Sequence, residues 1–370
     1  MEPSCYDDGN MEPLALNPRM REKERALTLA DYDYELPPKA IAKKPVKPRD
    51  ASKMLVVNRR TGRLVDARFR DLAHYLRPSD LLVLNNTRVL KARVFGKLAE
   101  GGRAVEVLFA NPLSERVWEV MLRPAKYIRK GARIDLYDGI GLRVGEQQND
   151  GLYLIELETS SQPSISEVLK QYGHLPLPPY IKRTARSSDE TDYQTVYASR
   201  MGAIAAPTAG LHFSARVFDS LDEIGIEVVE LTLHVGIGTF IPIRTEDPTD
   251  HQLKGEYYEI SQTGAESLNR ARHEGRRIVA AGTTTTRTLE HVFGQNRKFV
   301  AGTGKTDLYI MPGYRFLAVD VLLTNFHLPR TTLLLLVSAF ASRKIVLDSY
   351  RHALQEGYRF YSYGDSTLFV

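Results

Sequence analysis

Cysteine is almost absent from this sequence, and so is any secretory signal. Cys5 is the only cysteine among 370 residues, so neither an intramolecular disulfide nor a cysteine-based metal cluster can form. This usage suits a reducing compartment, and we expect a cytoplasmic protein. Residues 1–27 lack a basic start followed by a long apolar stretch, and we expect them to be a disordered tail rather than a signal peptide.

Long apolar runs are also missing. The longest one covers residues 333–341, and Arg343 and Lys344 follow it closely. A bilayer-spanning helix needs roughly 20 apolar residues. The run therefore predicts a buried helix, and we expect no membrane partner.

The usual catalytic and nucleotide-binding motifs do not occur. There is no HExxH, CxxC or Gly-x-Ser-x-Gly, so zinc hydrolysis and serine hydrolase chemistry have no support, and we expect no metal site. The Gly-x-Gly at 236–238 lacks the third glycine of a dinucleotide site, and Phe299 stands where a phosphate-binding loop ending in Gly-Lys-Thr (304–306) would need glycine. The chemistry must come from residues that are scattered in the sequence.

The hydrophobic pattern predicts an α/β fold with an insertion. A chain with 43% hydrophobic residues and this length favours two domains. Strand-like and helical stretches alternate over residues 53–84 and again after 164, whereas residues 89–157 carry short β-branched runs separated by turn residues. We expect a disordered tail at 1–27, an α/β catalytic domain formed by 28–88 and 163–370, and an inserted small β-barrel at 89–162. The proline-rich and charged segment 171–201 predicts an ordered loop.

Several short segments combine His, Arg, Asn, Tyr and Gly among apolar residues, as a site does when it needs polar groups and close backbone approach. They are NNTR (85–88), YGHLPLPPY (172–180), APTAGLHF (206–213), LHVGIGTF (233–240), EYYE (256–259), GTTTTRTLE (282–290), PGYRF (312–316), TNFHLP (324–329) and YGD (363–365). Taken in this order, they resemble the S-adenosylmethionine:tRNA ribosyltransferase-isomerase family. The resemblance runs from about Leu29 to the carboxyl end, and APTAGLHF and TNFHLP are its most specific parts.

The resemblance implies a reaction in which S-adenosylmethionine donates its ribosyl group. The acceptor is the aminomethyl group of 7-aminomethyl-7-deazaguanine at the wobble position of a tRNA with a GUN-type anticodon, and the products are epoxyqueuosine-tRNA, adenine and methionine. Because S-adenosylmethionine is consumed as a substrate, no cofactor is expected. The reaction needs a general base, an acid for the departing adenine, groups that tolerate a sulfonium, and donors for the methionine carboxylate. We expect the enzyme to be a monomer.

Three histidines are the acid and base candidates: His212, His234 and His327. Each lies beside a glycine or proline turn at an apparent strand or loop end, where side chains can converge on a cleft. A structural histidine is an equally good interpretation of any one of them, because an unperturbed pKa near 6.5 fits both uses. Glu256 and Asp365 are the carboxylates that could act as base or sulfonium counter-ion, and either could instead pair with an arginine.

Other residues of the same segments are candidates for substrate binding. The full set is Asn85, Arg88, Tyr257, Tyr258, Arg287, Asp307, Tyr314 and Asn325. Arg287 could bind the methionine carboxylate or a tRNA phosphate, and a surface arginine in a threonine-capped helix start is the equal alternative. Tyr257 and Tyr258 could face the sulfonium, although tyrosines in a strand more often serve packing. For Asn85 the alternative is turn or capping duty.

A formal net charge of +5 permits an anionic partner such as RNA without requiring one. The strongest basic patches lie at 39–49 and 180–186, and their tRNA-binding candidates are Lys43, Lys44, Arg49, Lys182 and Arg183. Solvated surface is the ordinary interpretation of either patch alone. A non-catalytic protein whose barrel holds the anticodon loop is the alternative function. An ordinary methyltransferase is a third, but the chain lacks its glycine-rich strand-to-helix turn.

Overall fold

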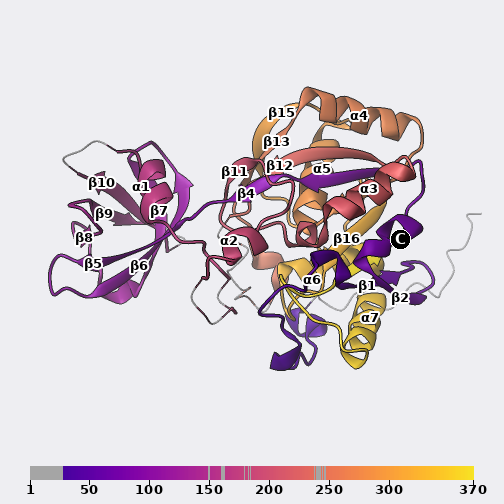
Figure 1. Cartoon of the computed structure of the whole chain (residues 1–370), viewed down its shortest axis with the longest axis horizontal. Coiled ribbons are helices and arrows are strands. Elements are labelled where there is room, and N and C mark those ends of the chain that lie inside the picture. The colour runs from indigo at the N-terminus through magenta and orange to yellow at the C-terminus, as the bar shows by residue number, and fades with distance from the viewer. Residues whose placement is uncertain are drawn as a thin grey trace, which may run out of the picture.

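The computed structural model describes residues 28–370 except 149–150, 160–162, 179, 182, 184, 237, 239–242, 244 and 246. The expected tail at 1–27 and the tRNA-binding candidate Lys182 therefore lie outside the described residues. Within the described part, the chain forms a large α/β body and a separate barrel, joined by narrow chain segments (Figure 1). The predicted fold class, an α/β domain interrupted by a small β-barrel, is confirmed.

The body is built on a mixed sheet of nine described strands. Their spatial order is β15 (Gly302–Thr306), β13 (Glu256–Ile260), β12 (Glu227–Leu233), β3 (Leu81–Asn85), β14 (Ile278–Ala281), β16 (Val321–Asn325), β17 (Ser366–Phe369), β1 (Lys53–Val57) and β2 (Leu64–Arg68). The central strands β12, β3, β14 and β16 are parallel to one another. All five residues of β3 are buried, as expected for a parallel strand covered on both faces.

Helices cover both faces of this sheet. One core cluster includes residues of α4 (Gln262–His273), α5 (Thr283–Asn296), α6 (Thr332–Ala341) and α7 (Arg343–Gln355), and the other includes α3 (Ala215–Glu223) and the 3-10 helix η4 (Phe69–Tyr75). Alternate residues of β3 and β1 belong to opposite clusters, which follows from the period of two along a strand. The apolar run at 333–341 is the predicted buried helix, α6. No helix in the described part of the chain is long and apolar enough to cross a membrane.

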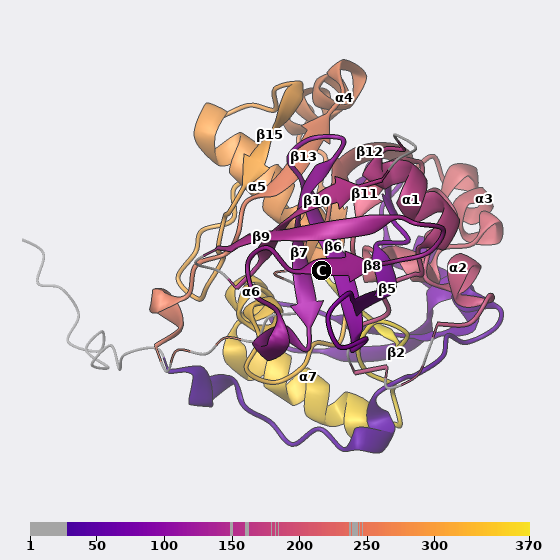
Figure 2. The same ribbon diagram turned by 90° about the vertical axis from the view of Figure 1, so that its left-hand side faces the viewer.

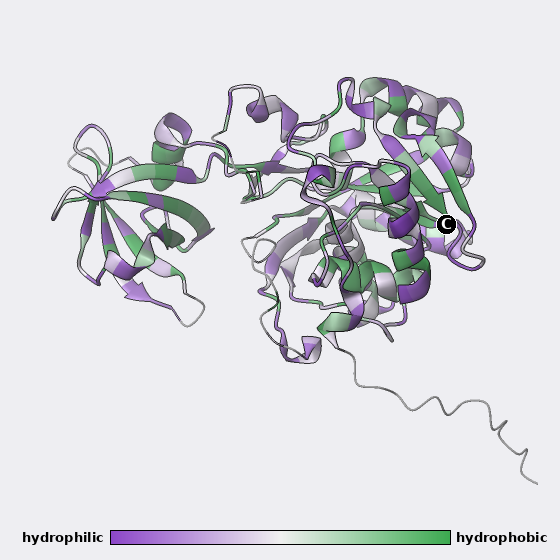
Figure 3. Cartoon of the chain, turned by 90° about the horizontal axis from the view of Figure 1, so that it is seen from below, coloured by the Kyte–Doolittle hydropathy of each residue, from purple (hydrophilic) through white to green (hydrophobic). Residues whose placement is uncertain are grey.

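The inserted domain is a closed barrel in the order β10-β7-β6-β5-β8-β9. Its strands are β5 (Arg93–Leu98), β6 (Ala104–Pro112), β7 (Val117–Arg123), β8 (Arg133–Asp135), β9 (Gly141–Gln147) and β10 (Tyr153–Glu158). In β7, inward residues are buried and alternate with more exposed ones, which gives the barrel its own core around Val107, Val120 and Ile155. Figure 2 shows the barrel in front of the body, and Figure 3 shows hydrophobic residues gathered in the strands of both domains.

Two short strands connect the domains. β4 (Thr87–Val89) leaves the body for the barrel and pairs in parallel with β11 (Arg200–Ala203), which lies on the return path. The predicted loop at 171–201 contains α2 (Asp189–Asp192) and is otherwise mostly irregular. The carboxyl ends of β3, β12, β14 and β16 all lie at one edge of the sheet, because these strands are parallel. Ligands of open α/β sheets bind outside this edge, so the fold predicts a binding site there.

Candidate functional site

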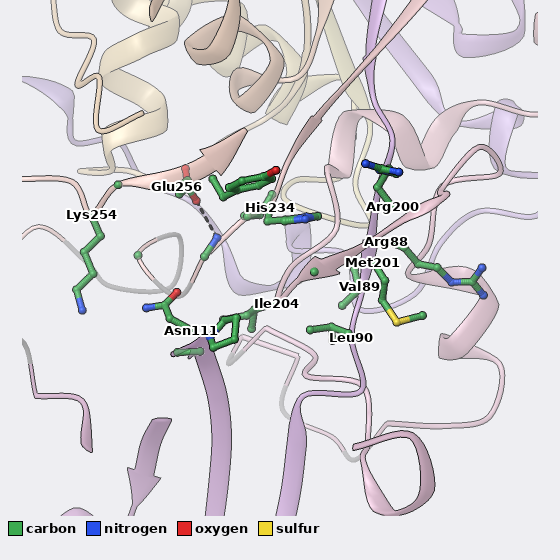
Figure 4. Close-up of a pocket in the computed structure, with 18 of the residues that line it drawn as sticks. Arg88, Val89, Leu90, Asn111, Arg200, Met201, Ile204, His234, Lys254 and Glu256 are labelled. Carbon is green, nitrogen blue, oxygen red and sulfur yellow. Dashed lines mark hydrogen bonds between the residues drawn. The ribbon is translucent and has the colours of Figure 1, made fainter. Parts of the chain in front are cut away.

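A wide cleft lies between the barrel and the carboxyl edge of the sheet. Its volume is about 1580 Å³, and its walls come from both domains. The barrel contributes Asn111 and Trp118, the connecting strands contribute Arg88 and Met201, and the body contributes the loop after β12 together with the start of β13. Figure 4 shows Arg88, Asn111, Met201, His234 and Glu256, which reach the cleft from several elements. The cleft is large enough for a ligand much bigger than a single metabolite.

His234 follows β12 directly and lines the cleft (Figure 4). Its Nδ1 lies 2.8 Å from the hydroxyl oxygen of Thr87, and its ring stacks on Tyr257 at 5.4 Å between centroids. The imidazole also packs closely against Gly202, since a Cβ at this position would lie only 2.5 Å from the His234 Nε2. Partial burial lowers the pKa of His234, while Glu259 raises it and Arg200 lowers it. His234 is therefore held in one position at the cleft wall.

Glu256 and Arg287 form a buried ion pair at the inner end of the cleft. The guanidinium of Arg287, in the first turns of α5, also donates from Nε to the carbonyl of Leu308 at 2.9 Å. The second oxygen of Glu256 accepts a hydrogen bond from the backbone N–H of Gly236 at 2.8 Å, which is the dashed line in Figure 4. The pair thus ties α5 and β13 to the loop that carries His234, and the two charges compensate each other.

A second, small pocket adjoins the cleft. Its volume is about 70 Å³. The walls are the segment 205–209, the start of α5, the end of β16 with the residues after it, and residues 361–362. Val235, Arg287 and Leu333 line both the pocket and the cleft. The two cavities therefore share a wall, and His327 and Asn325 belong to the smaller one.

Two of the three candidate histidines are deeply buried. His212, at the end of the 3-10 helix η6 (Thr208–His212), places Nδ1 2.7 Å from the Ser52 hydroxyl and Nε2 3.2 Å from the Asn325 amide nitrogen. The Nε2 of His327 lies 3.0 Å from the Thr324 hydroxyl. Burial lowers the pKa of each histidine to about 3. Both are neutral near pH 7 and act there as fixed hydrogen-bonding groups, whereas His234 faces the open cleft.

Asn85 and Asp365 brace the fold at two different points. Asn85 is fully buried, and its amide bonds both the N–H and the carbonyl of Leu233 at 3.0 Å, which extends the pairing of β3 with β12. The Asp365 carboxylate accepts hydrogen bonds from the N–H groups of Lys53 and Arg359 at 3.0 and 2.7 Å. Neither residue lines the cleft or the small pocket.

Three other candidates lie away from both cavities. The Tyr258 ring packs edge-on against His291 at 5.5 Å, the Tyr314 hydroxyl donates to a carboxylate oxygen of Glu290 at 3.2 Å, and Asp307 is exposed. By contrast Arg88, Tyr257 and Arg287 line the cleft, and Asn325 lines the pocket. The structure thus gathers part of the candidate set at one place and distributes the rest over the body.

The predicted basic patches and the basic residues of the cleft are different sets. Lys43 and Lys44 are exposed, the Arg49 guanidinium donates to the Gln194 carbonyl at 3.0 Å, and Arg183 pairs with Asp189. The cleft is lined instead by Arg88, Lys91, Lys170, Arg200, Lys254 and Lys305. Apart from Arg88, these cationic residues were missed because they are single residues far apart in the sequence. Lys305, for example, lies opposite Tyr257 on the adjacent strand only once the sheet has formed.

Fold and site together define an α/β protein that carries an inserted barrel and a ligand cleft at the carboxyl edge of its parallel strands. The family described as Queuosine biosynthesis protein matches residues 29–369, and the chain belongs to this family.

The similarity to its relatives covers almost the whole chain. A protein of Heliobacterium modesticaldum is 44% identical over 93% of this chain and 100% of its own length, and one of Moorella thermoacetica is 46% identical with the same coverage. Both are named S-adenosylmethionine:tRNA ribosyltransferase-isomerase. The crystal structure of an S-adenosylmethionine tRNA ribosyltransferase from Thermotoga maritima is similar with a TM-score of 0.53 and 34% identity, covering 92% of this chain and all of that one.

Proposed function

We propose that this chain is an S-adenosylmethionine:tRNA ribosyltransferase-isomerase, the activity for which its relatives are named. The single observation that carries the proposal is the full-length similarity, which includes every segment of the cleft wall. In this reaction S-adenosylmethionine is a consumed ribosyl donor, so the enzyme needs no separate cofactor. The acceptor is the 7-aminomethyl-7-deazaguanine at the wobble position of a GUN-type anticodon. The protein acts as a monomer in the cytoplasm.

The cleft suits a large anionic acceptor. It opens between two domains, and several basic side chains line it, among them Lys170, Lys254 and Lys305. Phosphate contacts dominate the affinity of proteins for nucleic acids. An anticodon loop that enters the cleft would bring its extruded base toward the sheet edge. Lys43 and Lys44 on the exposed surface would extend this contact along the tRNA.

His234 is the group best placed to move a proton in the cleft. The Thr87 hydroxyl and the Tyr257 ring fix its imidazole, and the side chain is only half buried, so it can reach a ligand in the cleft. A neutral imidazole can remove the proton next to the sulfonium, or a protonated one can assist the departure of adenine. The Tyr257 ring would contribute about 0.5–2 kcal/mol if the sulfonium lies over its face.

The direct test uses labelled S-adenosylmethionine and precursor tRNA with the full-length protein. We expect adenine and methionine to be released only when both substrates are present. Binding of tRNA without adenine release would overturn the proposal in favour of a non-catalytic anticodon-binding protein. Formation of S-adenosylhomocysteine would identify a methyltransferase instead.

A further inference from the structure

The small pocket contains a buried polar atom that its surroundings do not satisfy. Asn325 is 2% exposed, and its amide nitrogen lies 3.2 Å from both the His212 Nε2 and the Tyr361 carbonyl oxygen. Because the Tyr361 carbonyl can only accept a hydrogen bond, the NH2 end of the amide must face it. The other end, Oδ1, is buried without a hydrogen-bond donor among the described residues. Leaving such an acceptor unsatisfied is destabilising, so a ligand donor is its natural partner.

Another part of the pocket wall is the start of α5, a helix of 14 residues. The N-cap is Gly282, with φ of 98°, and it provides no side-chain cap. The hydroxyls of Thr285 and Thr286 donate backward to the carbonyls of Ala281 and Gly282, so they do not cap the helix start. The first N–H groups of a helix have no acceptor within it, and the helix dipole makes this end favourable for an anion.

The start of α5 and Asn325 Oδ1 favour two different chemical groups of one small ligand. The helix start suits a carboxylate, and Asn325 Oδ1 suits a group that donates hydrogen bonds, such as an ammonium. A phosphate offers no positive donor to Oδ1, and a volume of about 70 Å³ leaves room only for a compact group. An α-amino acid head carries a carboxylate and an ammonium on one carbon, and it fits both demands.

We propose that the small pocket binds the α-amino and α-carboxylate groups of the methionine part of S-adenosylmethionine. This inference rests on the proposed function. Because the pocket and the cleft share Val235, Arg287 and Leu333 as a wall, the sulfonium and ribose then lie toward the cleft, on the side of His234. Arg287, already compensated by Glu256, forms part of that wall and does not need to bind the carboxylate itself.

The test compares three ligands that share adenosine and its 5′-sulfur and differ in what that sulfur carries, each titrated calorimetrically into the full-length protein. They are S-adenosylmethionine, its decarboxylated form, and 5′-methylthioadenosine, which lacks the whole amino-acid group. Asn325→Ala should weaken S-adenosylmethionine about 10- to 100-fold, the usual range for a hydrogen bond to a charged group. The variant should weaken the decarboxylated form to the same extent, since its ammonium remains. Affinity for 5′-methylthioadenosine should stay within about twofold.

A second variant probes the other wall. Thr283→Pro removes one N–H at the first position of α5, where proline is well tolerated. It should weaken S-adenosylmethionine but not the decarboxylated form or 5′-methylthioadenosine. Asn296→Ala, near the far end of the same helix, is the matched control and should leave all three affinities unchanged. Affinity for 5′-methylthioadenosine also reports whether each variant is folded.

The results separate this inference from the function on which it rests. If Asn325→Ala weakens 5′-methylthioadenosine as strongly as S-adenosylmethionine, or weakens neither, the pocket does not hold the amino-acid group. A variant that loses tRNA affinity and keeps S-adenosylmethionine affinity would assign the pocket to an RNA phosphate and overturn the proposal. If instead the unaltered protein releases no adenine from S-adenosylmethionine and precursor tRNA, the proposed function itself fails.

Discussion

The small pocket and the cleft beside it are built in opposite ways. In the pocket, side chains are buried and held by the main chain, as Asn325 is by the carbonyl of Tyr361. The cleft is wide, lies between two domains, and is lined by long basic side chains such as Lys254 and Lys305. A rigid buried pocket suits one small ligand that must be oriented, and a wide basic cleft suits a large polyanion.

The same contrast separates the histidines. His212 and His327 support the region around the pocket, and burial lowers the pKa of each to about 3. His234 stands on the cleft side and is only half buried. Burial therefore separates these two histidines from His234, the residue that we propose moves a proton.

Replacing His234 with Ala should have the largest effect, because it removes the proposed proton-transfer group. We expect turnover to fall by about 10² to 10⁴-fold, with tRNA affinity and thermal stability nearly unchanged. Single-turnover release of adenine measures the effect. His74→Ala, at an exposed position on η4, is the matched control and should keep full activity. Full activity of the His234 variant would remove this residue from the mechanism.

Breaking the ion pair in the shared wall should destabilise the fold. Arg287→Met leaves the buried Glu256 carboxylate uncompensated, and loss of one partner of a buried pair costs about 3–5 kcal/mol of unfolding free energy. The double variant with Glu256→Gln should recover part of this loss, since no charge then remains buried. Denaturant unfolding of the single and double variants measures both quantities. A single variant that loses less than about 1 kcal/mol would show that the pair does not support the wall.

Acidification should lower the stability of the folded protein through His212, which lies beside the small pocket. In the unfolded chain this residue binds a proton below about pH 6.5, whereas burial lowers its pKa to about 3 in the folded protein. Between these values the unfolded state binds more protons, so stability falls as the pH falls. His212→Asn should remove about one proton from the uptake on unfolding at pH 5, or about 1.4 kcal/mol per pH unit.

The measurement is the unfolding free energy from denaturant curves at several values between pH 5 and pH 6. The informative quantity is the slope with pH, so a constant loss of stability in the variant does not affect it. His74→Asn serves as the exposed control. Equal slopes for His212→Asn and the unaltered protein would contradict the burial argument.

The cleft should carry part of the salt dependence of tRNA binding. The double variant Arg88→Ala, Lys305→Ala removes two cations of the cleft, and the slope of log affinity against log salt should become shallower by about 1.4–1.8. A parallel double variant, Lys43→Ala with Lys44→Ala, tests the exposed patch in the same assay. An unchanged slope for the cleft variant would place the tRNA elsewhere on the protein.

The sequence predicted the fold well because its strands carry local signals. Buried parallel strands such as β3 read as continuous apolar runs, and the barrel strands as short alternating runs. The site was harder to predict, since Glu256 and Arg287 come together only when the chain folds. No local pattern distinguishes Asn85, which hydrogen-bonds an adjacent strand, from Asn325, which lines the pocket. Periodicity reports burial along one element, whereas a cavity depends on several elements at once.

The most direct measurement is a crystal structure of the full-length protein with S-adenosylmethionine bound. We predict the carboxylate at the start of α5, the ammonium near Asn325 Oδ1, and the ribose on the cleft side near His234. Density for the ligand on another face of the sheet, or with its adenine in the small pocket, would contradict it.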